Sequence, residues 1–266
     1  MDEFIYKCYE DFKNFMCLDS NSLPDITPKL INQPDDITGK YPCAYINGNE
    51  IGNNPINLYY DITLPNYKME YIKGVLFHEF THIMDGIVLK ENYPYNKFIE
   101  LMKTYSEYHA VQIELGCKVG FRNIHSCHKI NLDKTFVYHQ NEKVKITSDY
   151  IANLADVAKI IEQPTDFYYN LPYIEYYRNY NNFFTKTMYY LGKRDFCKKY
   201  SFIQIKNITQ KTYGEFYPFI HTIESSIQNK IFDNIIEENM ALFYKYLSTF
   251  KLKEDELRML IKELNL

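Results

Sequence analysis

Residues 71–89 read YIKGVLFHEFTHIMDGIVL, an apolar stretch that contains the pentapeptide His78-Glu79-Phe80-Thr81-His82. Apolar residues recur in it at steps of three and four, which predicts an α-helix with one buried face. Positions four residues apart lie on the same face of a helix, so His78 and His82 can present two imidazoles to one metal ion. Glu79 lies beside them, where a carboxylate can take a proton from a metal-bound water molecule. The stretch therefore predicts both a central helix and a metal site on it.

The flanking sequence sets the ends of this helix. Pro65-Asn66 precedes it, and Asn92-Tyr93-Pro94 follows it as a stop signal. Gly74 lies one turn before His78 on the same face, where the missing side chain would let a neighbouring segment approach closely. The alternative interpretation is a half-buried helix whose two histidines are satisfied by hydrogen bonds and bind no metal.

A catalytic zinc site usually takes three protein ligands, so the third must come from elsewhere in the chain. Residues 95–117 form a second helix-patterned segment. It contains four candidate donors, Glu100, Glu107, His109 and Glu114. Glu107 is the predicted ligand, and the small Ala110 one turn later suits close packing against the first helix. Two alternatives stay open: the glutamates could form a solvated stripe, or His109 could be the ligand, although its face of the helix favours packing.

The sequence HEFTHIMD (78–85), followed by SEYHA (106–110), resembles the HExxHxxD … (S/N)E-x-x-A arrangement of gluzincin metallopeptidases. The resemblance covers roughly residues 40–115. It is most similar to the compact zincins of mobile elements and to the lethal-factor-like and Pro-Pro-endopeptidase-like clostridial proteases. The roles it implies are zinc ligand for His78, His82 and Glu107, and general base for Glu79. Asp85 matches the family's acidic residue, which implies that it orients a ligand through a hydrogen bond.

Some members of that family use a tyrosine before the third ligand to stabilise the oxyanion. Tyr93 and Tyr95 are candidates here, although their spacing from Glu107 does not match the family's well. Tyr105 is nearer in sequence, but two residues before Glu107 on a helix it would point to the opposite side. The oxyanion role therefore stays open. The metzincin pattern is excluded, because it requires a glycine at the position of Asp85.

The rest of the chain predicts an α+β fold with a zincin-like catalytic domain. Residues 2–16 have helical spacing, and Pro42–Ile46 and Ile56–Ile62 are β-like runs separated by Asn-Gly turn signals. We expect the catalytic domain, with its small N-terminal sheet and active-site helix, to span residues 1–144. From about residue 145 the pattern is mainly helical. We therefore expect residues 145–266 to form a helical domain on the other side of the cleft.

Two clusters outside the metal site are interpreted as structural. His125-Ser126-Cys127-His128 offers imidazole and thiolate donors, but adjacent positions rarely chelate one ion tetrahedrally, which favours a loop or packing role over a second metal site. Residues 167–191 are crowded with tyrosine and phenylalanine, for which core packing is favoured over a peptide-binding surface. Further helical patterns occur at 150–161, 215–249 and 254–265.

Composition narrows the classes of function. The chain has 266 residues and a net charge of −4, which argues against a nucleic-acid-binding protein. No apolar run reaches eighteen residues, so no membrane span is expected. The acidic N-terminus, MDEFIYKCYEDF, lacks the features of a signal peptide. The six cysteines are scattered without a CxxC pair, which indicates reduced thiols and a cytoplasmic protein.

The sequence as a whole favours a zinc-dependent endopeptidase acting on a peptide or protein substrate. The first alternative is a zincin-fold binding or regulatory protein, such as a toxin component, with little or no hydrolytic activity. The second alternative is a metal-free helical interaction protein in which the HExxH pattern arose by chance.

Overall fold

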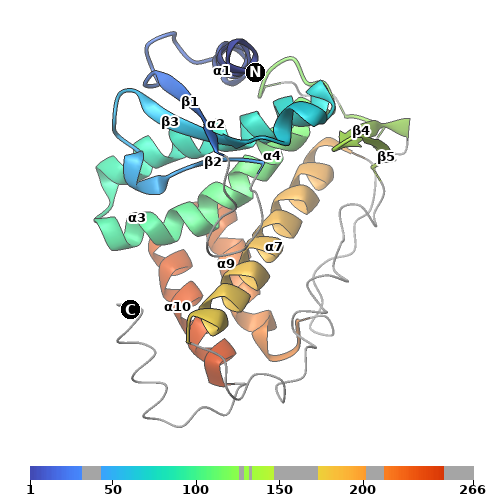
Figure 1. Ribbon diagram of the computed structural model, residues 1–266. Coiled ribbons are helices and arrows are strands. Elements are labelled where there is room, and N and C mark those ends of the chain that lie inside the picture. Colours follow the sequence, from blue (N-terminus) through green and yellow to red (C-terminus); the bar gives the residue numbers. More distant parts are fainter. Residues whose placement is uncertain (32–42, 126–128, 132–133, 147–172, 202–212, 249–266) are drawn as a thin grey trace. The chain divides into compact units, whose positions relative to one another are not determined.

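The computed structural model describes residues 1–31, 43–125, 129–131, 134–146, 173–201 and 213–248 (Figure 1). The described part mixes helices with two small sheets and is mostly helical, which confirms the α+β class. Contacts between residues divide the chain into two compact units. The first unit is Met1–Ile151 with Leu191–Ile205, and the second is Ala152–Tyr190 with Lys206–Leu266. This division groups Leu191–Ile205 with the first unit, and the expected boundary after residue 144 stays a prediction.

A three-stranded sheet lies in the first unit. Its strands are β1 (Ile26–Ile31), β2 (Ala44–Ile46) and β3 (Ile56–Asp61), in the order β1-β3-β2. β1 runs parallel to β3, and β2 runs antiparallel to it. The two predicted strand regions are confirmed as β2 and β3, but β1 was not predicted. Pro28 interrupts its strand pattern, and the structure tolerates this proline because β1 is an edge strand.

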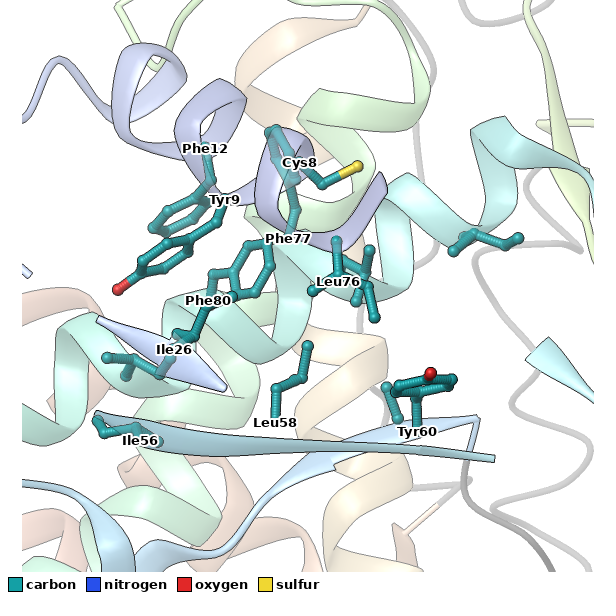
Figure 2. Packing of buried hydrophobic residues seen from close by; sticks show 14 of the residues in the cluster. Cys8, Tyr9, Phe12, Ile26, Ile56, Leu58, Tyr60, Leu76, Phe77 and Phe80 are labelled. Atoms are coloured by element: carbon teal, nitrogen blue, oxygen red, sulfur yellow. The ribbon is translucent and has the colours of Figure 1, made fainter. Parts of the chain in front are cut away.

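A core of large apolar side chains lies between the sheet and the N-terminal helix α1 (Asp2–Met16), which confirms the predicted opening helix. Figure 2 shows rings of α1 meeting rings of the central helix above the side chains of β3. The Phe12 and Phe77 rings are 5.4 Å apart and nearly perpendicular, and the Tyr9 and Phe80 rings are 4.8 Å apart. Each fully buried side chain of this size contributes about 1.5–3 kcal/mol of transfer free energy. This packing fixes the helix that carries His78 and His82.

The central helix α2 (Met69–Asn92) contains the whole HExxH stretch, as the sequence predicts. It begins soon after Pro65 and ends before Pro94. Leu76, Phe77 and Phe80 are buried in the core, while His78 and His82 lie on the side that contacts the next long helix. α2 is therefore buried on more than one face, as a helix at the centre of a domain must be.

The second predicted helix is confirmed, with an interruption that its sequence does not reveal. It consists of α3 (Tyr95–Leu101), a π-helical turn η3 (Met102–Ser106) and α4 (Glu107–Lys118). α4 lies alongside α2 (Figure 1). Isolated π turns within α-helices occur often at functional sites. Here the π turn ends at Ser106, immediately before the predicted ligand Glu107.

The first unit also contains a two-stranded hairpin of β4 (Phe136–His139) and β5 (Glu142–Lys145), which the sequence did not predict. The C-terminal part of helix α7 (Tyr173–Tyr200) belongs to the same unit. There Phe196, Cys197 and Tyr200 pack in a small core with Val137 of the hairpin.

The described part of the second unit is helical. It comprises the first part of α7, the short turn η6 (Gly214–Phe216), α9 (Tyr217–Asn229) and α10 (Phe232–Ser248). Tyr180 and Phe183 are buried, and Tyr180 donates a hydrogen bond to the backbone oxygen of Asn239 at 3.0 Å. The described members of the aromatic run therefore contribute to a core, and the helical pattern predicted near 215–249 is confirmed as far as Ser248. The predicted helices at 150–161 and 254–265 lie outside the described residues.

Two composition-based predictions can be compared with the structure. Across the described ranges, no helix combines the length and the apolar character needed to cross a bilayer. The cysteines that the structure describes are Cys8, Cys17, Cys43, Cys117 and Cys197, and all five are free thiols.

Candidate metal centre

His78 and His82 lie one turn apart on the face of α2 that contacts α4. Their exposed fractions are 6% and 9%, and their rings are 4.8 Å apart and nearly perpendicular. One donor atom from each of His78, Glu79 and His82 can be chosen so that the three atoms lie within 4.8 Å of one another. The structure therefore brings these three predicted residues together as a group that could hold a metal ion.

Glu107 faces the same point from α4. Its Oε2 lies 3.3 Å from His78 Nε2, and its Oε1 lies 3.7 Å from His82 Nε2. In a tetrahedral zinc site with bonds of about 2.0–2.2 Å, neighbouring donor atoms are about 3.3–3.6 Å apart. The two distances from Glu107 to the imidazoles are close to this donor spacing. Glu107 points toward both imidazoles and not into a solvated stripe.

The π turn before Glu107 sets its direction. A π turn contains more residues than an α turn, so it rotates the residues that follow about the helix axis. As a result Ser106 and Glu107, although adjacent, both contact α2: Ser106 Oγ lies 2.8 Å from His82 Nδ1, and Glu107 lies near the Nε2 atoms. A regular α-helix through residues 95–117 would predict only approximately which way Ser106 and Glu107 point.

Ser106 and Asp85 orient His82. Ser106 Oγ donates a hydrogen bond of 3.0 Å to Asp85 Oδ2, so its lone pair is available to accept from His82 Nδ1. A protonated Nδ1 leaves the lone pair on Nε2, the atom nearer Glu107. The orienting role predicted for Asp85 is therefore supported in an indirect form, since the carboxylate reaches the ligand through the serine hydroxyl.

His109, the rival ligand, is engaged elsewhere. Its Nδ1 lies 3.0 Å from Asp85 Oδ1, and its ring lies 5.8 Å from the ring of Tyr105. Tyr95, a candidate for the oxyanion role, is exposed and donates a hydrogen bond to Asn49 Oδ1 at 2.6 Å. Tyr93 lies at the C-terminal end of α2. The oxyanion role therefore stays open.

Glu114, one of the four candidate donors of the second helix, also lies beside His78. Its Oε2 lies 3.3 Å from His78 Nδ1, on the opposite side of the ring from Glu107. Glu114 follows Glu107 by seven residues, or two helical turns, so both carboxylates lie on one face of α4. The sequence makes Glu114 a candidate donor and leaves a solvated stripe as an alternative, but it does not predict the contact with His78.

Glu79 is held by the sheet. The backbone N–H of Ile46, the last residue of β2, donates a hydrogen bond of 3.2 Å to Glu79 Oε2. Burial raises the pKa of Glu79 to about 8, with Glu107 adding to the rise while His78 and the Ile46 N–H oppose it. A carboxylate with this pKa can accept and release a proton near neutral pH.

The two imidazoles differ in their electrostatic surroundings. Burial lowers the pKa of His78, but the carboxylates of Glu107 and Glu114 outweigh it and raise the pKa to about 10. For His82, burial dominates and lowers the pKa to about 4, because Glu107 is more distant and the neighbouring His78 repels a second charge. The pocket therefore favours one positive charge between the carboxylates, a place that a metal cation can take.

The cluster at residues 125–128, for which a loop or packing role was favoured, is only partly described. His125 is exposed, and its backbone N–H donates a hydrogen bond to Asn123 Oδ1 at 3.1 Å. Ser126, Cys127 and His128 lie outside the described residues.

Comparison with known proteins identifies no relative of this chain. No protein-family model matches the chain, and no curated protein or solved structure matches it. The resemblance to gluzincins rests on the two short motifs alone. What the molecule has is an HExxH group, placed on a buried helix face so that it could hold a metal ion.

Proposed function

We propose that this protein is a zinc-dependent endopeptidase. The observation that carries the proposal is that the Glu107 carboxylate lies 3.3 Å from His78 Nε2 and 3.7 Å from His82 Nε2, while Glu79 groups with both histidines. Two imidazoles and one carboxylate are a common ligand set of catalytic zinc, which keeps a further position open for water or substrate.

The donor set and its charge both fit zinc. Imidazole nitrogen and carboxylate oxygen are donors that Zn²⁺ accepts readily, and the carboxylates of Glu107 and Glu114 place negative charge on both sides of His78. When bound, the ion supplies a water molecule acidified toward neutral pH and polarises the scissile carbonyl. The remaining steps fall to side chains of α2 and the backbone of β2.

Glu79 is the proposed general base. The Ile46 N–H occupies one lone pair of Oε2, which fixes the carboxylate and leaves its other lone pairs for the attacking water. Glu79 takes a proton as the water oxygen bonds to the carbonyl carbon. It then returns that proton to the amine nitrogen as the C–N bond breaks, so the group ends each cycle unchanged.

Hydrolysis of a peptide library by the purified protein tests the proposal. We expect cleavage that a zinc chelator such as 1,10-phenanthroline abolishes and that added zinc restores. A non-chelating phenanthroline isomer serves as the control and should leave the rate unchanged. Cleavage that is indifferent to the chelator would contradict a zinc mechanism. Zinc-loaded protein that cleaves nothing would favour the alternative of a binding or regulatory protein.

A further inference from the structure

Two charged residues of α4 lie behind His78, on the side away from Glu107. Glu114 Oε2 is 3.3 Å from His78 Nδ1, and Lys118 Nζ donates a hydrogen bond to Glu114 Oε1. The exposed fractions of the two side chains are 19% and 4%. The Glu114 carboxylate thus lies next to the His78 imidazole, and the Lys118 ammonium lies next to that carboxylate.

The Lys118 side chain pairs with Glu114 one turn earlier on α4, and it packs against α2 over Gly74. A Cβ atom at position 74 would lie 2.4 Å from Lys118 Cε and 2.8 Å from Lys118 Cγ. The Lys118 ammonium also lies 4.8 Å from the centre of the Tyr71 ring, a cation–π contact. The close approach predicted at Gly74 is therefore confirmed, and the approaching group is a lysine side chain. This explains a glycine in a helix interior, where glycine costs stability.

The ion pair decides how His78 is presented. A carboxylate paired with a buried ammonium is an acceptor only, so its position 3.3 Å from Nδ1 favours the tautomer with the hydrogen on Nδ1. The lone pair then lies on Nε2, which is 3.3 Å from Glu107. Leaving either charge buried without the other would be costly, so the two residues act as a unit.

We propose that Glu114 is a positioning residue for His78, and that Lys118, lying over Gly74, holds Glu114 in place. The inference rests on the proposed zinc site and deepens it. The two ligands of α2 are oriented by different means: His82 by a hydroxyl and Asp85, and His78 by a charged pair. Partners of this kind typically contribute a factor of about 10–100 to metal affinity.

Zinc affinity of the metal-free full-length protein, measured by competition with a chromophoric chelator, tests the inference without using turnover. We expect Glu114→Gln to weaken zinc binding by about 10- to 100-fold. Lys118→Met, which keeps the apolar stem, should weaken it in the same direction. Glu91→Gln, on the exposed surface at the end of α2, is the matched control and should bind zinc like the parent protein.

Gly74→Ala gives an independent approach to the same unit. Alanine is the better helix former, so a weaker helix cannot explain a loss of affinity in this variant. We expect it to displace Lys118 and lower zinc affinity, although residue 74 carries no donor. Thermal melting of the metal-free variants identifies any that fail to fold. The zinc affinities of the variants that do fold then test the inference.

A spectroscopic readout checks the orientation directly. Long-range proton–nitrogen spectra of zinc-loaded parent protein should show His78 with hydrogen on Nδ1. Parent protein that binds zinc while the folded Glu114, Lys118 and Gly74 variants bind it equally tightly would overturn this inference and leave the proposed function standing. Parent protein that binds no zinc would overturn both.

Discussion

Glu79→Gln is expected to abolish nearly all peptide hydrolysis while zinc stays bound in a one-to-one ratio. Glutamine has the shape of glutamate, and its amide oxygen can still accept the Ile46 N–H, so the local structure should persist. What it loses is the ability to take a proton from the attacking water. General-base catalysis typically contributes about 10²- to 10⁴-fold, and kcat should fall by a factor in that range.

The control for this prediction is Glu70→Gln, on an exposed position in the first turn of α2. It removes the same charge from the same helix and should leave both kcat and zinc content unchanged. If Glu79→Gln hydrolysed peptides as fast as the parent protein, Glu79 would have no part in the mechanism.

Glu107→Ala is expected to lose zinc during dialysis, whereas Glu79→Gln keeps it. Removing the carboxylate leaves two imidazoles and removes the negative charge that offsets the charge of the ion in a buried pocket. The loss of affinity should exceed the roughly 10- to 100-fold expected for a residue that only orients a ligand. Metal analysis and the chelator competition assay both measure it.

Glu91→Ala provides the matched control for a glutamate-to-alanine change at an exposed site. A Glu107→Ala protein that kept a full equivalent of zinc at parental affinity would transfer the ligand role to another donor. Glu114, on the same face of α4, would then be the first residue to replace in the same way.

The central helix could be predicted from the sequence because its signals are local. The three- and four-residue spacing of apolar residues from Tyr71 to Leu89 predicts the helix. The HExxH spacing predicts that His78 and His82 lie on the same face of it. Gly74 also carried a readable signal, since a glycine in a strongly patterned helix indicates a close approach.

The rest depended on contacts between distant segments. The π turn before Glu107 is a property of the packed helix pair, and the residue types at 102–106 do not predict it. The partner of a charged residue is equally hidden, so the sequence left Glu114 as either a candidate donor or part of a solvated stripe and did not predict its contact with His78. Strand β1 was missed because Pro28 argues against a strand until its edge position is known.

Anomalous diffraction at the zinc edge, on crystals of the protein purified without added metal, tests the convergence of the three ligands most directly. We expect one full-occupancy peak about 2.0–2.2 Å from His78 Nε2, His82 Nε2 and a carboxylate oxygen of Glu107. Protein that contains no zinc even after zinc is supplied, or a peak bound by other residues, would contradict the account.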